Sequence, residues 1–182
     1  MWVGQRIVCG RCSGETPVFE EGLFGFYYEE RLRDAMHSFK FSGRKDVCKG
    51  LTGLIQQKII SFSWKFDCII PLPVTEKRLE ERGFNQSFII AEEISGMTNK
   101  PVLHRVLQKV KETKDQYTLS RDERKRNIKG AFSITDGAEV RGKKVLLVDD
   151  LYTTGHTARE AARILKKGKV KTVVFFALAR TP

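Results

Sequence analysis

The sequence has few cysteines and no long apolar run, and each shortage excludes a class of protein. Its four cysteines are irregularly spaced, which excludes the disulfide framework of a small secreted domain. The longest apolar run, residues 173–179, is far shorter than the ~20 residues that a membrane-spanning helix needs. The first residues also lack the apolar segment of a signal peptide. We therefore expect a cytoplasmic protein without membrane insertion, in which residues 173–179 form a core strand.

Motifs of several large enzyme classes are missing as well. The chain contains no P-loop, no G-x-G-x-x-G stretch and no H-E-x-x-H stretch. Cys9 and Cys12 have the spacing of half a zinc knuckle, but a structural zinc ion takes four ligands and no second C-x-x-C pair follows. We interpret this pair as a half-site remnant or a plain turn rather than a working Zn²⁺ site. Residues 1–17 are thus expected to form a partial zinc-knuckle-like segment, followed by the main domain at residues 18–182.

Positive charge is in clear excess in this sequence. Lys and Arg number 33 against 22 Asp and Glu, which gives a net charge of +11. Such an excess favours polyanionic partners, meaning nucleotides, diphosphates or nucleic acid, and a solvated basic surface without a partner is the alternative. The length of 182 residues and the apolar fraction of 41% suit one domain with a sizeable core.

The most informative stretch is Val145-Leu-Leu-Val-Asp-Asp-Leu-Tyr-Thr-Thr-Gly-His-Thr157. Its apolar start is typical of a strand buried on both faces of a parallel sheet, and two acids follow where that strand would end. Ligands of open α/β sheets bind at such carboxyl ends. The Thr/Gly turn then opens a helix, expected over residues 158–167, and the backbone amides at a helix start bind phosphate.

These residue types together describe a cradle for a sugar 5-phosphate. Asp149 and Asp150 are acceptors suited to the adjacent hydroxyl groups of a ribose. Threonine hydroxyls in the turn add donors, and Gly155 lets the backbone approach the anion closely. A helix-capping aspartate would explain one acid but would leave the second acid and the order of the turn residues unexplained. The predicted phosphate turn is Thr153, Thr154, Gly155, His156 and Thr157, with His156 interpreted as a helix-surface residue.

A second apolar strand is expected within residues 66–73, and it ends in a Pro-x-Pro loop of preset shape. Pro71, Leu72 and Pro73 form this loop, and Lys77 and Arg78 follow it. A basic, donor-rich loop after a strand is suited to hold a diphosphate, and an exposed basic turn is the alternative. A helix is then expected over residues 86–95.

The remaining elements are predicted from periodicity and turn residues. A short β-hairpin is expected at residues 18–28, helices at 29–41 and 46–61, and strands at 101–107 and 132–134. Residues 105–129 hold nine Lys and Arg against four acids, and within them we expect a loop at 109–118 and a short helix at 119–128. This segment is either a lid over the site or a solvated connection. Its candidate nucleic-acid contacts are Arg121, Arg124, Lys125 and Arg126.

The stretch at 145–157 resembles the phosphoribosyl diphosphate (PRPP) signature of type I phosphoribosyltransferases, with Tyr152 where that pattern has an aliphatic residue. This tyrosine is expected to pack either on the sugar or on the sheet edge. From about Phe26 onward the chain is also similar to the ComF family of phosphoribosyltransferase-like proteins. The residues that carry this second resemblance are Tyr28-x-x-x-Leu32, Lys40-Phe41, Pro71-Leu-Pro73, Lys77-Arg78, Arg82-Gly83-Phe84-Asn85-Gln86, Gln116, Leu119-Ser120, Arg124, Asn127 and Gly130-Ala131-Phe132.

The resemblance implies an α/β protein with a type I phosphoribosyltransferase fold, meaning a mostly parallel sheet flanked by helices, here with a small N-terminal hairpin and helix. It implies PRPP and Mg²⁺ as ligands and a link to natural competence, the uptake of DNA. The acid pair would take the ribose hydroxyls, the turn the 5-phosphate, and residues 71–78 the diphosphate. ComF proteins usually carry a four-cysteine zinc module, of which only Cys9 and Cys12 are present.

Two functions follow from these observations. The first is a phosphoribosyltransferase that passes the phosphoribosyl group to an amine or nucleobase, with Lys77 and Arg78 as the catalytic candidates. The second is a non-catalytic factor of the DNA uptake machinery that binds PRPP and single-stranded DNA. Stacking of bases on Phe84, Phe88 and Tyr117 would serve the second function, although core packing is expected for the two phenylalanines.

Overall fold

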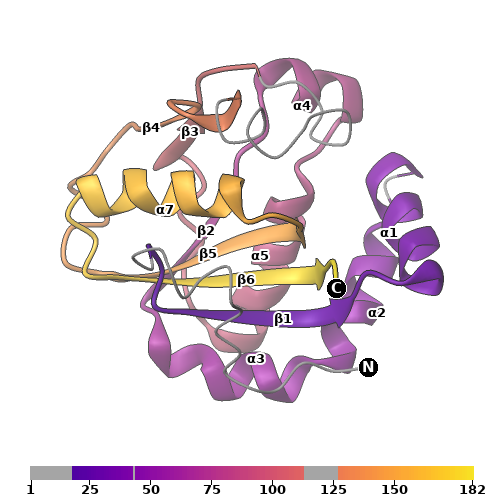
Figure 1. Ribbon diagram of the computed structural model, residues 1–182. Coiled ribbons are helices and arrows are strands. Elements are labelled where there is room, and N and C mark those ends of the chain that lie inside the picture. Colours follow the sequence, from indigo (N-terminus) through magenta and orange to yellow (C-terminus); the bar gives the residue numbers. More distant parts are fainter. Residues whose placement is uncertain (1–17, 43, 113–126) are drawn as a thin grey trace.

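A parallel four-stranded sheet forms the centre of the protein, as the computed structural model shows (Figure 1). The structure describes residues 18–42, 44–112 and 127–182. In spatial order the strands are β1 (Glu21–Tyr27), β6 (Thr172–Arg180), β5 (Lys144–Tyr152) and β2 (Cys68–Pro71). All three neighbouring pairs in the sheet run parallel, so the carboxyl ends of the four strands lie at the same edge.

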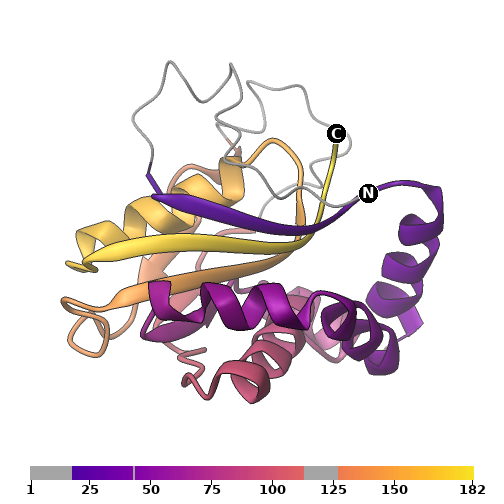
Figure 2. The same ribbon diagram turned by 90° about the horizontal axis from the view of Figure 1, so that it is seen from below.

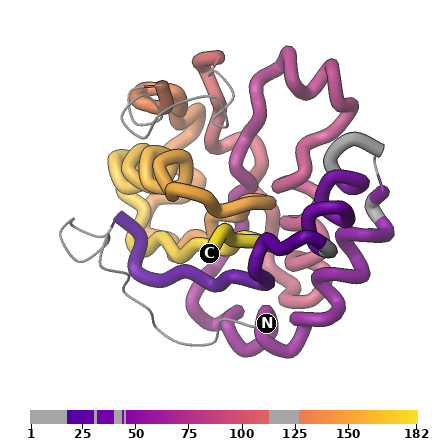
Figure 3. Tube along the Cα trace, turned by 45° about the vertical axis from the view of Figure 1, so that its right-hand side comes forward, coloured from indigo at the N-terminus to yellow at the C-terminus, as the bar shows by residue number. Residues whose placement is uncertain are grey.

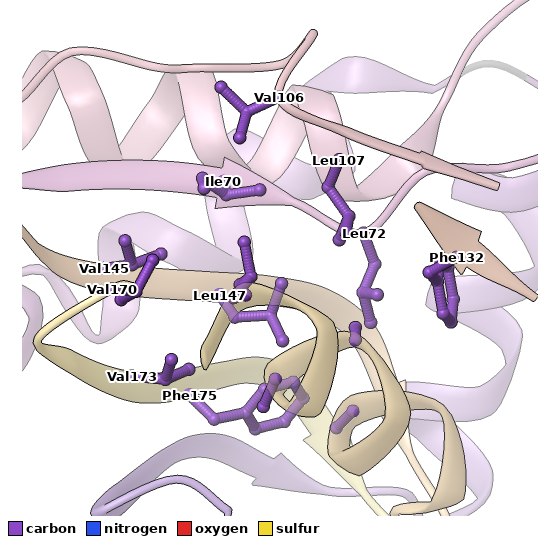
Figure 4. Packing of buried hydrophobic residues seen from close by; sticks show 14 of the residues in the cluster. Ile70, Leu72, Val106, Leu107, Phe132, Val145, Leu147, Val170, Val173 and Phe175 are labelled. Carbon is purple, nitrogen blue, oxygen red and sulfur yellow. The ribbon is translucent and has the colours of Figure 1, made fainter. Parts of the chain in front are cut away.

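Both faces of the sheet are buried, as the continuous apolar runs in β5 and β6 predict. Leu147 and Phe175 belong to one core cluster, and their sequence neighbours Leu146 and Phe176 belong to the other. Helix α7 (His156–Lys167) covers the first face, and Figure 4 shows side chains of β2, β5 and β6 packed together on that side. The second face is covered by helices from the N-terminal half of the domain (Figure 2).

The N-terminal hairpin expected at residues 18–28 is wrong. The segment is a single strand, β1, which pairs in parallel with β6 although the two come from opposite ends of the described chain (Figure 3). Gly25, a residue type that is common in turns, here permits close approach to β6, because a Cβ would lie 2.6 Å from the carbonyl oxygen of Leu178. The glycine therefore serves strand packing rather than a chain reversal.

Within the described residues, three α-helices precede β2. The predicted helix at 29–41 is confirmed as α1 (Glu30–Ser42). The helix predicted at 46–61 is interrupted, because α2 (Lys45–Leu54) and α3 (Gln56–Phe62) meet at Ile55 and a short 3-10 turn, η1 (Ser63–Lys65), follows. Ile55 is 5% exposed and packs in the second core, so burial of its side chain accompanies the break in the helix.

The segment after β2 differs most from expectation. Lys77, Arg78 and Arg82 belong to a short helix, α4 (Glu76–Arg82), rather than to a loop, and Gly83 ends that helix with a positive φ of 76°. Helix α5 (Gln86–Thr98) follows as predicted. The strand expected at 101–107 is reduced to a single bridge from Val102 to Ile69.

A small antiparallel pair, β3 (Leu107–Lys109) and β4 (Phe132–Ile134), forms a second sheet. The strand predicted at 132–134 is confirmed there. The loop predicted at 109–118 and the helix predicted at 119–128 lie largely in residues 113–126, outside the described residues. Among the helices of the described ranges, none has both the length and the apolar character needed to cross a membrane.

Candidate functional site

The acid pair lies at the carboxyl edge of the sheet, as predicted. Strand β5 continues through Tyr152, however. Asp149 and Asp150 therefore lie within the strand, near its carboxyl end, and do not follow that end. One carboxylate oxygen of Asp149 accepts hydrogen bonds from the Ser87 hydroxyl at 3.2 Å and from the Asp150 amide at 2.9 Å. Asp149 is thus held in place by its own backbone and by the first turn of α5.

Burial raises the pKa of the Asp149 carboxyl well above its usual range, and the neighbouring charge of Asp150 raises that pKa further. The hydrogen bonds from Ser87 and the Asp150 amide lower the pKa in part. The repulsion between two adjacent carboxylates costs free energy. Hydrogen bonds from hydroxyl groups, or a bound cation, would offset that cost. The pair is therefore suited to vicinal hydroxyls and to a ligand that arrives with a divalent metal.

We expect Asp149→Asn to stabilise the protein without ligand at neutral pH. The folded-state pKa of Asp149 is raised, so the wild-type protein loses this part of its stability as pH rises from the ordinary value of 3.8 through the folded pKa. Asparagine keeps an acceptor oxygen and carries no charge. Urea unfolding at several pH values should show a higher free energy of unfolding for the variant than for the wild type, with a difference that grows with pH across this window.

Asp34→Asn is the matched control for that measurement, because Asp34 lies on the exposed surface of α1. At the upper end of the pH window, the stabilisation by Asp149→Asn should exceed the effect of this surface substitution. An Asp149→Asn advantage that is absent, or that shrinks as pH rises, would contradict a raised pKa at this carboxyl.

The predicted phosphate turn connects the acid pair to α7. Gly155 is the N-cap of α7 with a positive φ of 76°, and the helix begins without a side-chain cap. A Cβ at this glycine would collide with the ring of Tyr152. Thr154 and His156 are joined by a hydrogen bond of 3.0 Å between the hydroxyl and Nδ1. Gly155 itself is buried, and because no side chain caps this twelve-residue helix, its first backbone amides are the donors to which an anion would bind.

The loop after β2 is held beside this edge by Asn85. The Asn85 side chain donates to the Leu72 carbonyl at 3.0 Å and accepts from the Ser87 amide at 3.0 Å, capping α5. Leu72 donates its amide to the Val148 carbonyl at 2.8 Å, and its side chain is buried in the core. Pro71 is buried as well. The amide and the carbonyl of Leu72 are thus both paired within the protein, and among these loop residues only Pro73 is partly exposed to a ligand.

Asn85 and Ser87 are site-supporting residues whose roles the sequence did not indicate. Asn85 lies within the Arg-Gly-Phe-Asn-Gln block, but only the fold shows that it connects the loop to α5. Ser87 is 4% exposed and reaches Asp149 across 62 positions of sequence. The signal that could have found Asn85 is its preference for N-cap positions.

Lys77 lines a cleft of about 1000 Å³ between the loop after β2, α4, α5 and β3. Pro71, Pro73 and the buried Thr75 also line it, and the Thr75 hydroxyl has no hydrogen-bond partner among the described residues. Neither the acid pair nor the phosphate turn contributes to this cleft. The structure therefore places Lys77 on the loop side of β2, while the acid pair lies on β5 and the predicted phosphate turn follows that strand.

The two described cysteines are free and buried. Burial raises the pKa of the Cys48 thiol to about 12 and that of Cys68 to about 11, which disfavours the thiolate that a metal would bind. No group of three or more potential metal ligands occurs within the described ranges. Cys9 and Cys12, like Tyr117, Arg121, Arg124, Lys125 and Arg126, lie outside the described residues, so their roles stay predictions.

Tyr152 packs on the sheet. Its ring lies 5.0 Å from that of Phe24 and 5.5 Å from that of Phe175, measured between centroids. Phe84 lies against Phe39 at 6.1 Å and belongs to the margin of the second core, while Phe88 meets His104 edge-on at 5.3 Å. Phe84 thus packs as predicted, and both Phe84 and Phe88 also line the cleft.

The matches to known proteins point to the same family that the acid pair and the turn indicate. Residues 45–182 match the family model described as phosphoribosyl transferase domain. Competence protein F of Haemophilus influenzae is 30% identical over 178 residues, which span 94% of this chain and 78% of that protein. The DNA utilization protein YhgH of Shigella flexneri is 30% identical over 181 residues, spanning 97% of this chain and 79% of that protein.

A solved structure of adenine phosphoribosyltransferase from Leishmania donovani is also similar, with a TM-score of 0.48 and 13% identity, over 79% of this chain and 68% of that one. The family model spans β2 to β6, which contain both the loop after β2 and the acid pair. The chain therefore belongs to the phosphoribosyl transferase domain family, with its type I fold, and within it to the ComF family of competence and DNA utilization proteins.

Proposed function

We propose that the protein binds PRPP with Mg²⁺ at the carboxyl edge of the sheet and transfers the phosphoribosyl group to an amine or nucleobase. The observation that carries this proposal is the order of three features along the chain. The acid pair lies on β5, a short turn follows the strand, and a left-handed glycine then opens α7. Asp149 and Asp150 would accept hydrogen bonds from the ribose hydroxyls. Thr153 to Thr157 would donate to the 5-phosphate, and the loop of Pro71, Leu72 and Pro73 would face the diphosphate.

The reaction needs positioning and charge stabilisation more than covalent chemistry by the protein. A nitrogen lone pair of the acceptor forms a bond to the anomeric carbon, the bond from that carbon to the diphosphate oxygen breaks, and its electron pair leaves with the diphosphate. The acceptor nitrogen then releases its proton to solvent. Negative charge grows on the leaving group, and Lys77 and Arg78 on α4 are the described cations nearest in sequence to the diphosphate loop.

The acid pair fits a Mg²⁺ complex because hard oxygen ligands and an unfavourable pair of negative charges both favour that ion. The chemistry that Mg²⁺ supplies when bound with PRPP is neutralisation of the diphosphate oxygens. A dedicated protein cage is not needed for this, because Mg²⁺ keeps several waters and uses substrate phosphates as ligands. The protein accordingly needs to supply few or no direct ligands to the ion.

Calorimetric titration with PRPP in MgCl₂, followed by an assay of diphosphate release, tests the proposal. We expect saturable binding, and faster release when a suitable amine or nucleobase is added. A panel of free purines, pyrimidines and simple amines covers the acceptor classes. Absence of PRPP binding would contradict the site itself, whereas binding without release in any condition would favour a non-catalytic role.

That non-catalytic role, as a PRPP- and single-stranded-DNA-binding factor, is the second candidate. The net charge of +11 favours it, and so do the names of the relatives, which refer to competence and DNA utilization. Binding of single-stranded DNA should weaken steeply with salt. Neutralising Arg121, Arg124, Lys125 and Arg126 together should reduce that salt dependence in a gel-shift assay, and an unchanged slope would exclude them as phosphate contacts.

A further inference from the structure

Arg180 is the last residue of β6 and lies at the same edge of the sheet as the acid pair. It is the register partner of Tyr152 on β5 and of Tyr27 on β1. Its backbone is fixed on both sides, because its carbonyl accepts from the Tyr28 amide at 2.7 Å and the next amide, of Thr181, donates to the Tyr152 carbonyl at 2.9 Å. Figures 1 and 2 both show the end of β6 beside the turn that leads from β5 into α7.

The guanidinium of Arg180 is held by aromatic rings rather than by acids. It lies 5.4 Å from the centroid of the Phe24 ring and 5.3 Å from that of the Tyr27 ring. Its Nε is buried, and among the described residues it has no hydrogen-bond partner and no carboxylate forms an ion pair with the guanidinium. A buried donor without a partner is costly, and Arg180 as a whole is partly exposed, so a ligand that brings an acceptor to its guanidinium would be stabilised here.

The order of the strands places Arg180 on the side from which an acceptor would approach. Strand β5 lies between β2 and β6 in the sheet. The proposed diphosphate loop follows β2 on one side of β5, and Arg180 ends β6 on the other side. In a displacement at an anomeric carbon with inversion, nucleophile and leaving group occupy opposite faces of the sugar. With the sugar on β5 and the diphosphate toward β2, the nucleophile would approach over the β6 and β1 side.

We propose that Arg180 binds an oxyanion of the acceptor, and that the acceptor is a planar ring compound carrying a carboxylate. The planar guanidinium fork matches a carboxylate bidentately, and Phe24 and Tyr27 hold that fork in one orientation. This inference rests on the proposed function, because the order of leaving group, sugar and acceptor along the sheet edge comes from the proposed PRPP site. It goes beyond that function by naming the class of acceptor.

The test uses the full chain saturated with PRPP and MgCl₂. Calorimetry then compares planar acids with their uncharged counterparts, using orotate with uracil, nicotinate with nicotinamide, and benzoate with benzamide as probes. We expect at least one acid to bind the wild-type protein at least tenfold more tightly than its counterpart. Arg180→Gln should bring that ratio close to one while the PRPP affinity changes less than twofold, which also shows that the variant is folded.

Two further variants sharpen the result. Arg180→Lys keeps the charge but loses the fork, so it should retain only part of the preference for the acid. Arg141→Gln is the matched control, because Arg141 is an exposed arginine in the turn before β5, at the opposite edge of the sheet, and it should leave every ratio unchanged.

Several outcomes would overturn the assignment of Arg180. These are an acid preference that persists in Arg180→Gln, the absence of any acid preference in the wild-type protein, and a tenfold loss of PRPP affinity in Arg180→Gln. The last would show that the guanidinium serves the sugar phosphate instead. Failure of the proposed function is distinguishable from all three, because PRPP itself would then fail to bind before any acid is added.

Discussion

Replacing Asp149 and Asp150 together by asparagine is expected to weaken PRPP binding by a hundredfold or more. Each carboxylate would accept a hydrogen bond from a ribose hydroxyl, and hydrogen bonds to charged groups contribute about 1.5–3 kcal/mol each. Loss of two such bonds corresponds to about 3–6 kcal/mol, and every 1.4 kcal/mol is about a tenfold change in affinity. The loss of charge would also remove the electrostatic attraction of the site for a ligand that arrives with Mg²⁺.

Calorimetric titration of PRPP in MgCl₂ measures this effect, with circular dichroism as the check that the double variant is folded. The variant should be no less stable than the wild type without ligand, because the charge at Asp149 is disfavoured in the folded protein. Weaker binding together with equal or higher stability separates a role in ligand binding from a role in folding. Unchanged PRPP affinity in the double variant would falsify the assignment of the sugar to β5.

Gly155→Ala is expected to lower the free energy of unfolding by about 2–5 kcal/mol and to reduce PRPP binding severely. Gly155 has a φ of 76°, and a side chain in the left-handed region costs about 1–2 kcal/mol. The added methyl group would also collide with the Tyr152 ring, and overpacking costs typically about 1–3 kcal/mol. Relief of this collision requires movement of the Tyr152 ring or of the turn that is proposed to hold the 5-phosphate.

Gly142→Ala separates the two contributions. Gly142 has a nearly equal φ of 73°, but a Cβ there meets nothing within 4 Å. Urea unfolding of this variant should show only the backbone contribution, about 1–2 kcal/mol, with PRPP affinity unchanged. Adding Tyr152→Leu to Gly155→Ala should recover part of the stability that is lost to the collision. Equal destabilisation by the two glycine variants would show that Tyr152 does not restrict the turn.

Much of the candidate site could be predicted from the sequence because its signals are local. A strand, two acids, a turn and a helix follow one another within residues 144–167, and each is specified by its own side chains. The apolar run predicts burial on both faces, and the glycine predicts a backbone conformation that few other residues adopt. The boundaries were less accurate, since β5 continues past the acids to Tyr152.

The errors lie where a distant partner decides the local structure. Residues 18–28 have the aromatic and glycine content of a hairpin, but pairing with β6 makes them an edge strand of the main sheet. The basic residues after β2 have the composition of a loop, but Lys77, Arg78 and Arg82 form α4 with an acidic first turn and a glycine at its end. Neither outcome is visible in a short window of sequence.

By itself, the sequence determined the buried strands, the acid pair and the glycine turn, because hydrophobic burial and backbone conformation act on neighbouring residues. Only the tertiary structure decided what surrounds them. It brought Ser87 to Asp149, Asn85 to the loop at Leu72, and Arg180 to the rings of Phe24 and Tyr27 at the edge where the acids lie. The physical reason is that hydrogen bonds and ring contacts of this kind depend on distances of a few ångströms between residues far apart in the chain, which the packing of the parallel sheet and its helices sets.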